Sequence, residues 1–106
     1  MLTAFLTLIG LHALADYPLQ GDFLAKAKNR LAPIPGVPFW QALGAHAAIH
    51  ALFVATVLDW RFGVAEFVAH ALIDDSKCAG RISYNVDQAL HAFCKGAWVI
   101  LFFGVA

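Results

Sequence analysis

The chain has 106 residues, of which 61% are hydrophobic and only 13% are charged. Soluble domains carry about a quarter of charged residues, so this composition predicts a membrane protein. Seven basic and seven acidic residues leave no net charge, and no basic run contains interleaved aromatic residues, which argues against nucleic-acid binding. Cys78 and Cys94 lie too far apart in sequence to form a metal-binding pair and predict no disulfide framework.

The apolar residues predict four transmembrane helices, at about 2–17, 39–58, 62–76 and 86–105. Crossing the hydrocarbon layer takes about 20 residues, so the second and fourth are long enough, whereas the first and third are short and require a thinner bilayer. The first ends in Ala13-Leu14-Ala15, which resembles a signal-peptidase site. Because no basic segment precedes it, we expect a retained helix. The predicted fold is an all-α, integral membrane four-helix bundle in a single domain, 1–106.

The connection between the first two helices contains a further helical pattern. Pro18 ends the first helix, and prolines at 33, 35 and 38 precede the second. One helical face of this connection carries Leu19, Phe23, Ala27 and Leu31, and the opposite face carries Lys26, Lys28 and Arg30. The pattern predicts a short amphipathic segment that lies in the membrane interface.

Basic residues are concentrated in two of the three connections. Three lie between the first and second helices, and Lys77 and Arg81 lie before the fourth; the remaining connection offers only Arg61. The positive-inside rule therefore places both basic loops in the cytoplasm and both termini outside, in a multi-pass protein of the cytoplasmic (inner) membrane.

Each predicted helix carries polar residues at intervals of four. These are His12 and Asp16; His46 and His50; Glu66, His70 and Asp74; and Asp87, His91 and Lys95. An interval of four places the members of each set on one helical face. With a rise of about 1.5 Å per residue from the cytoplasmic ends, all five histidines fall in neighbouring layers, so we expect them to converge.

Three interpretations of these polar faces are open. A solvated face would contain lysine and arginine, which here are mostly in the connections. A buried hydrogen-bonded network would hold the helices together without a ligand. A metal site would use His12, Asp16, His46, His50, His70, Asp74, Asp87 and His91 as ligands of a divalent ion, with zinc expected first and iron or manganese as alternatives. These ligands are more numerous than one tetrahedral ion can bind, so they predict either two ions, or one ion whose ligands are held by further carboxylates.

The same residues carry a resemblance to a known family. "HALADYPLQGDFLAKAK", "HAAIH", "HALIDDSK" and "DQALH" occur in this order over nearly the whole chain. The pattern resembles the small integral membrane proteins of phages and bacteria that are grouped as domain of unknown function 3307. The resemblance implies a membrane location and no transferable activity.

Three functions remain possible from the sequence. The first is a metal-dependent hydrolase for a lipid-like or phosphorylated substrate, with Glu66 as general base and Lys95, Lys77 or Arg81 neutralising a phosphate. The second is proton or metal transport, for which the apolar outer halves of the helices would require a homo-oligomer. The third is a non-enzymatic phage or bacterial membrane factor, acting in lysis, exclusion or regulation, whose polar residues form a structural network. The lipid bilayer is the expected partner in each case.

Overall fold

The computed structural model describes residues 1–104, and this part of the chain is all-α, as predicted. Its five helices are α1 (Leu2–Asp16), α2 (Gly21–Ala27), α3 (Phe39–Val57), α4 (Trp60–Cys78) and α5 (Tyr84–Gly104). The short helix expected in the first connection is α2. The third long helix, expected at 62–76, has 19 residues, so it is not short. Residue 105, at the end of the fourth predicted helix, lies outside the described residues.

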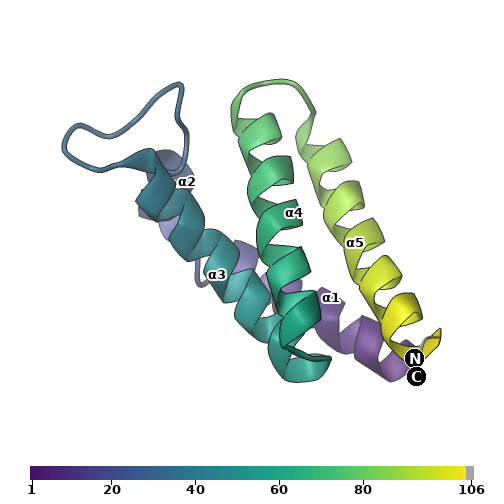
Figure 1. Cartoon of the computed structure of the whole chain (residues 1–106). Helices are drawn as coiled ribbons and strands as arrows, with labels where there is room; N and C mark the ends of the chain where they lie inside the picture. Colours follow the sequence, from purple (N-terminus) through teal and green to yellow (C-terminus); the bar gives the residue numbers. More distant parts are fainter. Residues whose placement is uncertain (105–106) are drawn as a thin grey trace.

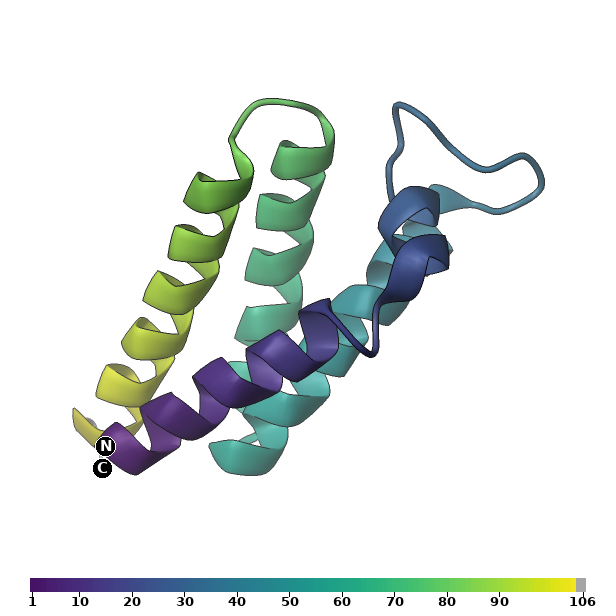
Figure 2. The ribbon, with the colours of Figure 1, turned by 180° about the vertical axis from the view of Figure 1, so that it is seen from behind.

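The four long helices run alternately in opposite directions (Figure 1). α1 packs against α3 and α5, and α4 packs against the same two helices. The view from behind shows α1 on the side away from α4 (Figure 2). The start of α1 and the end of α5 therefore lie at one end, and α2, its connection to α3 and the α4–α5 turn lie at the other (Figure 1). We call the latter the loop end.

The close approach of α3 and α4 depends on a glycine. A Cβ atom at Gly63 would lie 2.7 Å from the Cβ of Ala55 and 2.9 Å from the carbonyl oxygen of Ala51. Asp59 caps the start of α4 by accepting hydrogen bonds from the backbone N–H groups of Arg61 and Phe62. The pKa of Asp59 is held below its ordinary value of 3.8, first because the Arg61 side chain donates a hydrogen bond to it.

The interior is polar and much of the surface is apolar. Buried Leu8, Val54 and Val99 form a small apolar cluster. Large apolar side chains point outward from several helices; for example, Leu52 is 64% exposed and Phe93 is 73% exposed. In the described part of the chain, ten polar or charged residues are buried: His12, Lys28, His46, His50, Glu66, His70, Asp74, Asp87, His91 and Lys95. Buried ionisable side chains in this number are unusual, because such residues are mostly exposed in folded proteins unless they are paired.

Judged by length and hydropathy, one described helix, α3, is long and apolar enough to cross a membrane by itself. α1 and α2 reach this standard only as a pair, and they are bent by 86° relative to each other. α1 alone has only 15 residues. α4 and α5 have the length, but both contain several charged or strongly polar residues.

Candidate functional site

The structure brings together the five histidines of four helices. His12 comes from α1, His46 and His50 from α3, His70 from α4 and His91 from α5. The rings of His50 and His70 are stacked with their centroids 3.8 Å apart, and His70 stacks on His91 at 4.2 Å. The ring centroid of His46 lies 4.8 Å from that of His50, and the centroid of His12 lies 5.0 Å from it. The histidines of the four long helices therefore point towards one another in the interior of the bundle.

The carboxylate of Asp16, at the end of α1, joins three of these rings. Its Oδ1 lies 2.9 Å from His50 Nε2 and 3.2 Å from His46 Nε2. Its Oδ2 lies 3.1 Å from His12 Nε2 and accepts a hydrogen bond of 3.0 Å from the amide of Gln88. The Gln88 oxygen lies 3.1 Å from the same nitrogen of His12. One carboxylate thus connects α1 with α3 and α5.

A first set of possible metal donors consists of Asp16, His46, His50 and His70, which we call the Asp16 group. Each offers one atom, and these atoms all lie within 4.8 Å of one another. Zinc bonds of about 2.1 Å in a tetrahedron place the donors about 3.4 Å apart, so atoms at the 4.8 Å limit would have to approach one another by about 1.4 Å. Among the described residues, both ring nitrogens of His70 are buried without a hydrogen-bond partner. His46 Nε2 is also without one, because its 3.2 Å contact with Asp16 Oδ1 does not have hydrogen-bond geometry.

A second set consists of Glu66, His70 and His91, all buried, which we call the Glu66 group. One atom from each again lies within 4.8 Å of the others. Glu66 Oε2 lies 3.6 Å from His70 Nδ1. The other oxygen of Glu66 lies 2.8 Å from Lys95 Nζ and accepts a hydrogen bond of 3.3 Å from the indole of Trp98.

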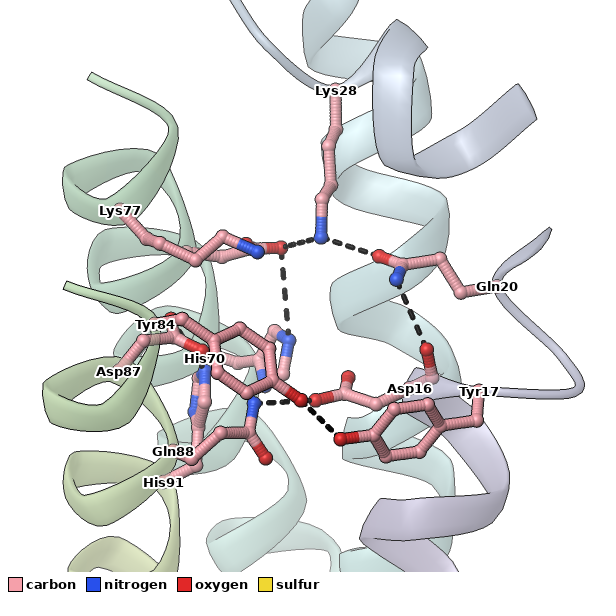
Figure 3. A pocket seen from close by; sticks show the side chains of 11 residues that line it. Asp16, Tyr17, Gln20, Lys28, His70, Lys77, Tyr84, Asp87, Gln88 and His91 are labelled. Carbon is pink, nitrogen blue, oxygen red and sulfur yellow. Dashed lines mark hydrogen bonds and ion pairs between the residues drawn. The ribbon is translucent and has the colours of Figure 1, made fainter. Parts of the chain in front are cut away.

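Two ion pairs join the α1–α3 connection to the end of α4. Lys28 Nζ lies 2.7 Å from Asp74 Oδ2 and also donates a hydrogen bond to Gln20 (Figure 3). The guanidinium of Arg30 donates to both oxygens of Asp75, at 2.9 and 3.0 Å. Lys28 is therefore buried and points inward, whereas the sequence pattern had placed it on the outer polar face of the amphipathic segment. That expectation was wrong because Asp74 provides a buried counter-ion.

A cavity of about 160 Å³ lies beside the histidines at the loop end. Asp16, His70, Asp74 and His91 form part of its lining, and Lys28 and Lys77 also contribute. Tyr17 at the end of α1 and Tyr84 at the start of α5 share a hydrogen bond through their hydroxyl groups and line the same cavity (Figure 3). Asp16 of the Asp16 group, His91 of the Glu66 group and His70, which belongs to both, thus border one cavity at the loop end.

The remaining residues singled out from the sequence lie around these two groups. His12 contacts Asp16, Asp74 pairs with Lys28, and Asp87 Oδ1 lies 3.3 Å from His91 Nε2. None of these three belongs to either donor group. Glu66 and Lys95, expected to be catalytic, pair with each other and are absent from the lining of the cavity beside the histidines.

Several residues of the site were not assigned roles from the sequence. They are Tyr17, Gln20, Lys28, Tyr84, Gln88 and Trp98. Gln20, Lys28 and Gln88 are part of the pattern that resembles the family, which was the only signal for them. Spacing alone does not distinguish buried Lys28 from exposed Lys26.

The family model described as "Protein of unknown function (DUF3307)" matches residues 4–103. No curated protein and no solved structure matches the chain. The match covers nearly the whole sequence, including all the polar residues of the site. The chain belongs to the domain of unknown function 3307 family.

Proposed function

We propose that this protein is an integral membrane metal-binding protein that acts as a metal-dependent hydrolase at its loop end. The observation that carries the proposal is the Asp16 group: one carboxylate and three imidazoles from three helices, with their donor atoms within 4.8 Å of one another. Carboxylate oxygen and imidazole nitrogen are ligands of zinc, iron and manganese, and facing helices commonly supply them.

The surface supports a membrane location. Outward-facing apolar side chains such as Leu6, Leu52, Leu72, Phe93 and Ile100 occur on all four long helices. Helices of 19 and 21 residues are about 28 and 31 Å long, which matches a hydrocarbon layer of about 30 Å. The polar residues that lower the hydropathy of α4 and α5 are largely buried, so lipid would not contact them. The basic connections lie at the loop end, which we place on the cytoplasmic side.

Buried charge also favours a cation. The site contains four carboxylates, of Asp16, Glu66, Asp74 and Asp87, and two buried ammonium groups, of Lys28 and Lys95; the partly exposed Lys77 adds a third beside Asp74. The carboxylates therefore outnumber the ammonium groups. Uncompensated charge in a low-dielectric interior is costly, and a bound cation would reduce it.

The cavity supports the hydrolase part of the proposal. Its volume of about 160 Å³ has room for several water molecules beside the Asp16 group. A bound divalent ion would supply Lewis-acid chemistry and lower the pKa of its water. Lys77, which faces the cavity and is partly exposed, is placed to bind an anionic group such as a phosphoester, and Lys28 holds Asp74 in position. Because this cavity is small, only the head group of a lipid-like substrate would fit into it.

The test is the metal content of the purified full-length chain, measured by mass spectrometry in wild type, His46→Ala and Asp16→Asn. We expect a stoichiometric divalent metal in wild type and a lower metal content in both variants. Asp22→Asn is the matched control, because Asp22 is an exposed carboxylate of α2 that belongs to neither donor group. Folded wild-type protein without metal would refute the proposal and favour a buried network in a non-enzymatic membrane factor. Turnover of phosphoester substrates that persists in His46→Ala would refute the hydrolase assignment alone.

A further inference from the structure

The Glu66 group contains three buried donor atoms without hydrogen-bond partners. They are Glu66 Oε2, His70 Nδ1 and His91 Nδ1. Buried polar atoms are nearly always paired in folded proteins, because an unpaired one has lost its hydrogen bonds to water without replacement. Three such atoms from residues that approach one another indicate a common ligand, and two imidazoles with one carboxylate match the preference of divalent transition metals.

Neighbouring side chains hold these donors in an orientation that suits a cation. Lys95 and Trp98 both contact Glu66 Oε1, which leaves Oε2 free to face His70. Asp87 lies 3.3 Å from His91 Nε2, so an N–H at this position would leave Nδ1 with its lone pair available. Metal-binding histidines are usually oriented in this way, by a carboxylate on the second ring nitrogen.

His70 is common to both donor groups, and its two ring nitrogens face different neighbours. Nδ1 lies 3.6 Å from Glu66 Oε2. Nε2 lies 3.9 Å from Asp74 Oδ2, and that oxygen is 3.7 Å from His46 Nε2. One nitrogen therefore faces the Glu66 group and the other faces the Asp16 side of the site.

We propose that Glu66, His70 and His91 bind a second divalent cation, and that His70 bridges the two ions through its two ring nitrogens. This inference rests on the proposed metal-binding function. A bridging imidazole gives up its ring proton to solvent when the second ion binds, so the bridge itself adds one negative charge. Glu66 is thereby a metal ligand, and Lys95 is a positioning residue that fixes the carboxylate.

Metal titration of the chelator-stripped, full-length chain tests the inference. Zinc bound at saturation is counted by mass spectrometry, with cobalt(II) titration followed by visible absorption as an independent count. We expect two ions in wild type, one in His91→Ala, which leaves the Glu66 group two donors, and one in His46→Ala/His50→Ala, which leaves the Asp16 group two donors. Each variant leaves the other group complete, so the ion that it retains reports that the variant is folded. Lys95→Met should change the affinity for the second ion at least tenfold while its first ion is unchanged.

The outcomes separate this inference from the function on which it rests. Wild type that binds no metal overturns both. Wild type that binds one ion, with His91→Ala unchanged, overturns the second site and leaves the first intact. A His91→Ala variant that is helical and monodisperse but binds no ion also overturns the inference, because His91 would then serve the Asp16 group. Magnetic coupling between two copper(II) ions bound to wild type would support the bridge, and two bound copper(II) ions without coupling would overturn it.

Discussion

Lys28→Met is expected to destabilise the protein strongly, although Lys28 lies in a connection between helices. Its ammonium group lies 2.7 Å from Asp74 Oδ2, and both side chains are only 3% exposed. Methionine has a similar length and no charge, so the variant removes the counter-ion while preserving much of the packing. Asp74 would be left as a buried carboxylate without its principal partner.

The magnitude follows from the distance and the burial. At an effective dielectric constant of about 20, opposite charges 2.7 Å apart attract by about 6 kcal/mol. The hydration lost by both groups offsets much of this attraction, and removal of one partner of a buried pair typically costs about 3–5 kcal/mol. Lys77 Nζ remains 3.8 Å from Asp74 Oδ1 and provides partial compensation. We therefore expect a loss of about 3 kcal/mol.

Equilibrium unfolding of the detergent-purified chain, followed by helical circular dichroism, measures this loss. Lys26→Met is the matched control, because Lys26 lies two residues away and is exposed; its effect should be within about 0.5 kcal/mol. The double variant Lys28→Met/Asp74→Asn should recover at least half of the loss, since it leaves no buried charge at this position. A loss below about 1 kcal/mol in Lys28→Met, or no recovery in the double variant, would refute the reasoning.

Two further predictions concern the start of α4. Gly63→Ala should lower the free energy of unfolding by about 1–3 kcal/mol, because the new methyl group would collide with Ala55 and with the backbone of Ala51. Gly10→Ala, at a helical position with open space, is the control and should be neutral or stabilising. Equal effects of the two substitutions would contradict this account. The helix cap formed by Asp59 should weaken in acid, because the pKa of Asp59 is lowered in the folded state. The stability that the charged Asp59 adds is complete above the ordinary pKa of 3.8 and is lost as the pH falls through the folded-state pKa. The hydrogen-exchange protection of the Arg61 and Phe62 amides, relative to Asp59→Ala, should decline over that acid range, and protection that stays constant would contradict the prediction.

The sequence was sufficient to predict the helices, because prolines and polar connections interrupt the apolar runs. The third helix was predicted at 62–76, and the structure extends it by two residues at each end, to Trp60–Cys78. At its loop end Lys77 was assigned to the connection because it is basic and follows the apolar run. In the structure Asp74 and Asp75, just before it, pair with Lys28 and Arg30. These pairs join residues more than 40 positions apart, and no local pattern predicts them.

The convergence of the histidines was predictable because the interval of four recurs in every long helix and the depths of the residues agree. Which side chains each carboxylate contacts was not predictable. Asp16 contacts three histidines, whereas the nearest partner of Asp74 is a lysine and Asp87 contacts a single histidine. Spacing determines which face of a helix a residue occupies, but the partner on that face depends on the rotation and tilt of the neighbouring helices.

The low mean hydropathy of α4 has a physical explanation in the residues that it contributes to the site. A hydropathy window gives equal weight to the outer and inner faces of a helix, whereas a bilayer would contact only the outer face. In α4, Glu66, His70 and Asp74 lower the mean hydropathy, yet all three are buried. Val64, Val68 and Leu72, on the other face, are more than half exposed. Three of the residues that lower the hydropathy of α4 therefore form its wall of the site, and ionisable residues placed in this way are those that a bilayer would not contact.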